Sequence, residues 1–182
     1  KGNAIIRKNL LDSSFKDGSA YFGLLNPEEE TAGPYSDFSF AVFPDSMNDV
    51  QTCVVSLGVG SLGFRNDYQL AALPGLRRMF LKLYDDNTFL KTSFDDIEST
   101  SSDLLKEIRL KYPLLRDVIE SYKTVLPASC IVNIQEKGGL DTIFAWLATY
   151  AKIRSWGTKN NRKAVDDFLT SVNSASNTNE EQ

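Results

Sequence analysis

The chain has 182 residues, of which 42% are hydrophobic and 11% aromatic, so it can bury a core and is not disordered throughout. A formal net charge of −4 excludes a domain that is basic as a whole, but it is compatible with a local basic patch. Histidine is absent, which removes the commonest general base, the Ser-His-Asp triad and the usual imidazole metal ligand.

Short elements are expected at the start of the chain. Residues 3–12 place four aliphatic side chains at roughly helical spacing, which predicts a short amphipathic helix. Asp17 and Gly18 favour a turn. Residues 21–25 predict a short strand, which Asn26 and the following proline end.

Two adjacent strands follow. Residues 37–43 alternate with period two and have a strongly aromatic face. Residues 51–59 are rich in valine, which indicates an inner strand, and residues 45–49 would join the two as a long hairpin loop. The aromatic group could be a stacking surface, or part of the core as aromatics on half-buried strands usually are; it comprises Tyr35, Phe38, Phe40 and Phe43.

Helical patterns dominate after Gly63. Pro74 suits the first position of a helix that would reach about Tyr84, and residues 88–94 predict a short extended segment. A β-branched run predicts a further strand over residues 128–134. Other helices are expected over residues 99–111, 113–125, 140–151 and 161–172.

The order of these elements favours a single α+β domain, because strands come first and mostly helices follow. We expect an antiparallel sheet from the N-terminal half, with several packed helices that are mostly C-terminal. Residues 1–173 are assigned to this recognition or interaction domain, and residues 174–182 to a polar linker or disordered tail. The start at Lys1 and the polar tail lead us to expect a fragment of a longer protein, whose motor or catalytic parts lie elsewhere.

A glycine pattern follows the valine-rich strand. Gly58, Gly60 and Gly63 match G-x-G-x-x-G, and Asp85 lies about where a ribose ligand is expected. A dinucleotide site requires that the third glycine open a helix packed on a parallel strand. Here Pro74 interrupts the chain before any helix could cross the sheet, and the preceding strands look antiparallel. We therefore interpret the motif as a glycine-rich strand end, with positive φ or a close backbone approach, and expect no cofactor.

Catalytic and metal-binding chemistry has little support in the sequence. No carboxylates form a distinct spaced pair, and the P-loop pattern G-x-x-x-x-G-K-[ST] is absent. The pairs Asp95-Asp96 and Asp166-Asp167 are expected at helix N-termini or as solvated charges. We predict no metal site and no enzyme, without excluding a Ser, Lys or Tyr mechanism.

The two cysteines, Cys53 and Cys130, lie far apart in apolar, strand-like runs. Their spacing fits neither a metal site nor a disulfide framework, so we expect buried free thiols in a reducing cytoplasm. No apolar run reaches the ~18 residues of a membrane span and no signal-peptide pattern is present, so we expect no membrane partner.

Basic residues are the sharper candidates for binding. Between Lys152 and Lys163 the chain carries cations with no acid between them, and Trp156 lies among them. Phosphate contacts with aromatic stacking are what nucleic-acid binding requires; the alternative is a solvated helix end at which cations interact favourably with the dipole. A second basic cluster flanks the glycine-rich strand end. The candidate nucleic-acid-binding residues are Arg65, Arg77, Arg78, Lys152, Arg154, Trp156, Lys159, Arg162 and Lys163.

One part of the chain resembles a known family. The resemblance is carried by Gly23-Leu-Leu-Asn-Pro27, Gly33-Pro-Tyr-Ser-Asp-Phe-Ser-Phe-Ala-Val-Phe-Pro44, Val55-Ser-Leu-Gly-Val-Gly60 and Leu73-Pro-Gly-Leu-Arg-Arg78. These segments resemble the N-terminal region of large bacterial AAA-type ATPases related to McrB, the GTPase of modified-cytosine restriction. The resemblance covers residues 18–80 and, more weakly, 146–156. It implies a domain placed ahead of an NTPase motor and used for target recognition, sometimes of modified DNA; it carries over no base-flipping residue.

Two hypotheses of function follow. The first is a non-catalytic recognition domain of a McrB-like NTPase or restriction-type system, which binds DNA, modified or not, and has other domains of a longer chain as partners. The second is a protein-interaction or assembly module with no nucleic-acid contact, which the acidic pI near 4.9 favours. Binding to DNA that weakens steeply with salt would distinguish the first from the second.

Overall fold

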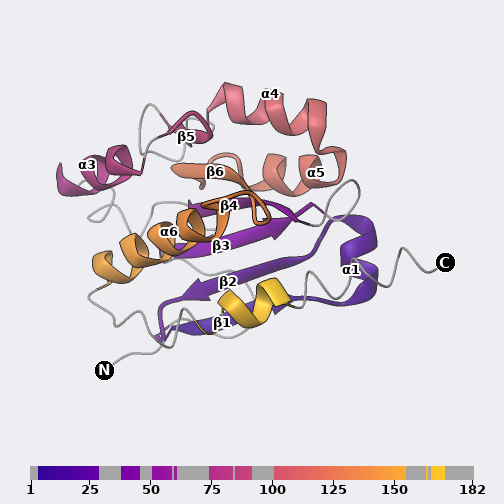
Figure 1. Cartoon of the computed structure of the whole chain (residues 1–182), viewed down its shortest axis with the longest axis horizontal. Helices are drawn as coiled ribbons and strands as arrows, with labels where there is room; N and C mark the ends of the chain where they lie inside the picture. Colours follow the sequence, from indigo (N-terminus) through magenta and orange to yellow (C-terminus); the bar gives the residue numbers. More distant parts are fainter. Residues whose placement is uncertain are drawn as a thin grey trace.

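The protein folds around one six-stranded antiparallel sheet (Figure 1). The structure, a computed structural model, describes residues 4–28, 38–45, 51–58, 60, 74–83, 85–91, 101–154, 163 and 165–170. The strand order is β1-β2-β3-β4-β6-β5. The strands are β1 (Ile5–Asn9), β2 (Tyr21–Leu25), β3 (Ser39–Pro44), β4 (Thr52–Gly58), β5 (Thr88–Leu90) and β6 (Ala128–Asn133).

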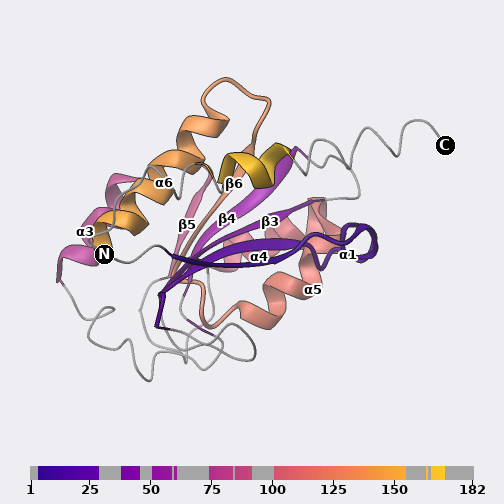
Figure 2. The same ribbon diagram turned by 90° about the horizontal axis from the view of Figure 1, so that it is seen from below.

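Helices cover both faces of this sheet. Figure 2 shows α3, α6 and the helical residues 165–170 on one face, and α4 and α5 on the other. We call these the α6 face and the α4–α5 face. The helices are α1 (Asp12–Asp17), α3 (Pro74–Lys82), α4 (Ser102–Lys111), α5 (Pro113–Tyr122) and α6 (Gly139–Ile153).

Covering on both sides explains why the inner strands are buried along their whole length and are mostly apolar, with Ser56 of β4 in a buried hydrogen bond to Ser129 of β6. Every residue of β3 and β4 is buried. Along β3, Phe40 and Val42 join the core of the α6 face, whereas Ala41 and Phe43 join the core of the α4–α5 face. Successive side chains of a strand point to opposite faces, so a strand buried on both faces needs apolar residues at both sets of positions.

The helix α6 is fixed to the sheet by its buried aromatic residues. Trp146 and Tyr150 are 1% and 0% exposed. The Tyr150 hydroxyl lies 3.0 Å from the carbonyl oxygen of Leu24 and 3.1 Å from that of Phe38, and shares its proton between them. This hydroxyl therefore joins the end of β2 and the start of β3 to a helix that lies more than a hundred residues later in the chain.

Most of the expected elements are confirmed. The strands expected over residues 21–25, 37–43, 51–59 and 128–134 are β2, β3, β4 and β6, and β4 has the expected inner position. The α+β class and the antiparallel sheet are confirmed as well. The expected helices are present as α3, α4, α5, α6 and the helical residues 165–170.

Some expectations lie outside the described residues. The hairpin loop falls mostly on residues 46–50, and only its closing bond is described, from the Asp45 amide to the Thr52 carbonyl at 2.8 Å. The far end of the extended segment 88–94 and the proposed boundary after residue 173 also lie there. The described strands form a single sheet, with helices on both of its faces (Figure 2).

The prediction of a helix over residues 3–12 is wrong. The segment Ile5–Asn9 forms β1, which places Ile5 opposite Leu25 and Asn9 opposite Tyr21 on β2. Half-buried and exposed side chains alternate along β1, which is the period of a strand. The aliphatic residues of this segment fit a helix only roughly. A strand is favoured because it pairs with backbone groups of β2 that would otherwise lack hydrogen-bond partners.

Candidate functional site

Some of the candidate basic residues lie on α3 and at the C-terminal end of α6. Arg78 and Lys152 are exposed, as is Lys82 on α3, and no ion pair among the described residues involves any of the three. The backbone of Arg77 lies in α3, but its side chain is outside the described part. Arg65, Trp156, Lys159 and Arg162 lie outside the described residues altogether.

Arg154 is engaged in contacts within the protein. Its Nη2 donates to the carbonyl oxygen of Phe38 at 2.6 Å, and its guanidinium carbon lies 5.8 Å from the ring centre of Phe38 and 5.9 Å from that of Tyr150. These are cation–π distances. For Arg154 the geometry favours the structural alternative over a phosphate contact.

Lys163 is also engaged within the protein. Its ammonium donates to both carboxylate oxygens of Asp167, at 2.8 and 3.1 Å, one helical turn away. The hydrogen bond with Asp167 raises the pKa of Lys163 above its ordinary value. This is the solvated i, i+4 pair that helix surfaces commonly carry.

Phe38 brings the two basic segments together. Its ring stacks on Phe80 of α3 with ring centres 6.2 Å apart, and its carbonyl accepts from Arg154 at the end of α6. The C-terminal end of α6 and α3 therefore meet on the same face of the sheet (Figure 2). We define the basic face as Arg78, Lys82 and Lys152.

The aromatic group on β3 is core and not a stacking surface. Phe38, Phe40 and Phe43 are 1%, 0% and 5% exposed, and Tyr35 lies outside the described residues. Buried rings of this kind supply packing energy and cannot hold a base from solvent. The interpretation as core is therefore correct for these three phenylalanines.

The glycine pattern lies at a strand end. Gly58 is the last residue of β4 and pairs with Ser39, and a Cβ there would lie 3.3 Å from the Leu126 side chain and 3.4 Å from the Val125 carbonyl oxygen. Both neighbours of β4 are antiparallel. A dinucleotide site requires a parallel strand and a crossover helix, so the arrangement fits a close backbone approach instead.

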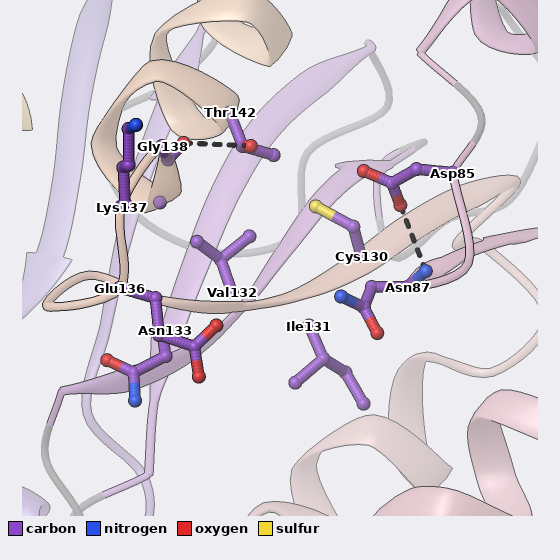
Figure 3. A pocket seen from close by; sticks show the side chains of 11 residues that line it. Asp85, Asn87, Cys130, Ile131, Val132, Asn133, Glu136, Lys137, Gly138 and Thr142 are labelled. Atoms are coloured by element: carbon purple, nitrogen blue, oxygen red, sulfur yellow. Dashed lines mark hydrogen bonds between the residues drawn. The ribbon is translucent and has the colours of Figure 1, made fainter.

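Two hollows flank the end of β6, and sequence patterns did not point to either. The first, of about 170 Å³, lies on the α6 face beside the start of α6 (Figure 3). Asp85, Cys130, Glu136, Lys137 and Thr142 are among its lining residues. Its wall depends on Gly139, where a Cβ would overlap the carbonyl oxygen of Asn133. The helix can approach β6 this closely only because that residue is glycine.

The second hollow, of about 540 Å³, lies on the α4–α5 face between α4 and the ends of β5 and β6. Asn87, Ile131, Asn133 and Glu136 line both hollows, so the end of β6 separates them. Its residues come from β4, α4 and the segments around β5 and the end of β6, and only the tertiary packing of these elements brings them together.

The cysteines are free and buried, as expected. Burial raises the pKa of the Cys130 thiol well above its ordinary value, and the charges of Asp85 and Cys53 act in the same direction. A thiol of raised pKa is a poor nucleophile, so the position of Cys130 in the first hollow does not make it reactive. Within the described residues, no cluster of three His, Cys, Asp or Glu side chains could hold a metal ion.

None of the described helices combines the length and apolar character needed to cross a membrane. Comparisons with protein-family models, with curated proteins and with solved structures gave no match. Function is therefore inferred from the residues and their geometry.

Proposed function

We propose that this chain is a non-catalytic recognition domain that binds DNA through the basic face. The observation that carries the proposal is the contact of Phe38 with both Phe80 and Arg154, which places α3 beside the end of α6. Two basic segments that are at least 70 positions apart in the sequence thus lie on one face. Lysine and arginine side chains that are free of internal carboxylates can neutralise phosphates and release counterions.

The distribution of charge supports this choice of surface. On the α4–α5 face, most described cations pair with nearby acids, among them Arg109 and Lys123 with Glu120, and Lys111 with Glu107. The described cations of the basic face have no such partner. A protein with net negative charge can therefore still present a local surface that attracts a polyanion.

The sequence resemblance supplies the context of the proposal. A domain ahead of a McrB-like NTPase motor would act in the bacterial cytoplasm, with other domains of a longer chain as partners and modified DNA as one target class. Arg65, Arg77, Trp156, Lys159 and Arg162 remain candidate DNA-binding residues.

A salt titration of DNA binding tests the proposal. Fluorescence anisotropy would follow a labelled duplex of one sequence, with and without 5-methylcytosine, between about 50 and 200 mM salt. We expect binding that weakens steeply as salt rises. In the triple variant Arg78→Ala, Lys82→Ala, Lys152→Ala, the slope of log K against log salt should fall by about one unit for each phosphate that is no longer neutralised.

A matched control removes the same number of positive charges elsewhere: Lys16→Ala, Arg109→Ala, Arg116→Ala. These cations lie on α1, α4 and α5, so the control should retain the salt slope of the unchanged protein. Equal reductions in affinity in both variants would show that only net charge matters and would contradict the proposal. Absence of binding at low salt would also contradict it, and would leave the protein-interaction module as the better hypothesis.

A further inference from the structure

The second hollow, which we call the α4 groove, has the features of a peptide-binding site. It lies on the α4–α5 face. The helices α3 and α6, which carry the basic face, lie on the opposite side of the sheet (Figure 2). Its wall combines an open strand edge, exposed apolar side chains and a surplus of carboxylates. The strand edge can bond to the backbone of a ligand, the apolar side chains can contact its apolar side chains, and the carboxylates can contact its cationic side chains.

The strand edge is open because β5 is shorter than β6. The strand β5 pairs with Ala128–Cys130, and the last bond on that side runs from the Ile131 amide to the Asn87 carbonyl at 3.2 Å. Ile134 donates in the other direction, to Gln51 on the β4 side. Amides alternate in direction along a strand, so the Asn133 amide faces the β5 side, where β5 has already ended. Among the described residues no carbonyl accepts from it.

The apolar wall comes from side chains that the core does not use. Leu110 is 75% exposed, whereas Leu104, Leu105 and Ile108 of the same helix are buried. Phe89 and Ile131 line the groove beside it and are only half-buried. An isolated exposed leucine is ordinary, but an exposed leucine over a hollow with further apolar walls marks a docking surface.

The charges of the groove favour a basic ligand. Four carboxylates and two lysines line it, and one of these lysines, Lys111, already pairs with Glu107. Lys106 thus remains against Asp86, Asp103 and Glu136. A ligand with positive side chains would offset this surplus, and an acidic one would be repelled.

We propose that the α4 groove binds an extended peptide segment of another protein as a short strand added at the edge of β6. A backbone carbonyl of the segment accepts from the Asn133 amide. An apolar side chain lies against Leu110, Phe89 and Ile131, and flanking lysine or arginine side chains lie beside the carboxylates. Alternate side chains of an added strand point to opposite faces, so the intervening residues enter the first hollow.

Amide chemical shifts of the folded ¹⁵N-labelled domain test the proposal directly. The probe is the peptide acetyl-Lys-Ser-Leu-Ser-Lys-amide, which places two lysines and a leucine on one face of a strand. Its control, acetyl-Glu-Ser-Leu-Ser-Glu-amide, reverses the charges. We expect saturable shifts at the amides of Ile131 and Asn133 with the lysine peptide and none with the control.

Substitutions separate the groove from other surfaces. Leu110→Ser should weaken binding of the lysine peptide roughly tenfold, which corresponds to about 1.4 kcal/mol of binding free energy. Leu11→Ser is the matched control, because Leu11 is 67% exposed and does not line the groove; it should leave the affinity unchanged. Both leucines are exposed, so neither change should unfold the protein.

Several outcomes would overturn the proposal. These are equal binding of the two peptides, shifts confined to α3 and α6, and no shift at millimolar lysine peptide. Concentration-dependent dimerisation that shifts the same amides without peptide would assign the groove to a second copy of this chain and would also overturn it. DNA titration should leave the Asn133 amide unshifted, so failure here is distinguishable from failure of the DNA-binding proposal.

Discussion

The helices on the two faces of the sheet come from differently spaced parts of the chain. On the α6 face, Tyr150 bonds to carbonyls 126 and 112 residues away, and Phe168 stacks on Phe22 at 5.2 Å. On the α4–α5 face, the two helices follow one another in the chain, and Glu120 of α5 accepts from Arg109 of α4. One face is therefore covered by segments that are distant from one another in the chain, and the other by two helices that form a local hairpin.

The solvent-exposed surfaces of the two faces also differ in how their charged groups are paired. The helical hairpin neutralises most of its described charges internally and leaves a groove with an open strand edge. The α6 face uses its polar groups to hold buried carbonyls and leaves the cations of the basic face without carboxylate partners. This contrast underlies the separate binding roles that we propose for the two faces.

The largest expected difference concerns the cores. Trp146→Ala on the α6 face should reduce the free energy of unfolding by about 3–5 kcal/mol, because it removes the largest fully buried side chain in the described part of the chain. Leu105→Ala on the α4–α5 face should cost about 2 kcal/mol, since Leu105 is smaller and 8% exposed. Urea unfolding followed by circular dichroism measures both. An equal or larger reduction for Leu105→Ala would contradict the ranking.

A smaller difference is expected between two tyrosine hydroxyls. Tyr150→Phe removes the donor that Leu24 and Phe38 share, and should cost about 1–3 kcal/mol because buried carbonyls lose a partner. Tyr122→Phe on the other face keeps the stacking of its ring on Phe43, and no described residue bonds to its hydroxyl. This control should change stability by less than about 0.5 kcal/mol. Similar losses of stability in the two variants would show that the hydrogen bonds of the Tyr150 hydroxyl do not add to the stability of the fold.

The smallest effect concerns acid stability on the α4–α5 face. The hydrogen bond from Arg109 lowers the pKa of Glu120 below its ordinary value, with a further contribution from Lys123. A lowered carboxyl pKa stabilises the fold at pH above the ordinary value, and this contribution disappears as pH falls through the folded-state pKa. Unfolding midpoints measured from pH 7 down to about pH 2 should therefore fall less steeply in Glu120→Gln than in the unchanged protein. Parallel curves would show that the pair contributes nothing to the pH dependence.

The sequence predicted the inner part of the fold well. The period-two pattern of β3 and the valine content of β4 predicted both strands, although not their burial on both faces, and a proline opens both α3 and α5. Such signals are local, and local propensity coincides here with the tertiary arrangement. The prediction for the segment of β1 was wrong because the sequence patterns of edge strands are weaker, and their conformation depends on the neighbouring strand with which they pair.

The candidate site was predicted only in part. Residue type and charge runs identified Arg78 and Lys152, but the same reasoning selected Arg154 and Lys163, which the structure joins to Phe38 and Asp167. A cation in a sequence carries no information on whether its partner is a phosphate or a carbonyl of its own chain. The hollows beside β6 had no local signal at all.

The sequence by itself determined the class of fold, the inner strands, most helices and the buried state of Cys53 and Cys130, because these follow from hydrophobic period, turn residues and composition. Only the tertiary structure decided that β6 lies between β4 and β5, that Phe38 joins α3 to the end of α6, and that the Asn133 amide faces an open edge. These features depend on the register and proximity of segments distant in the chain, and such long-range pairing leaves no periodic pattern in a single sequence.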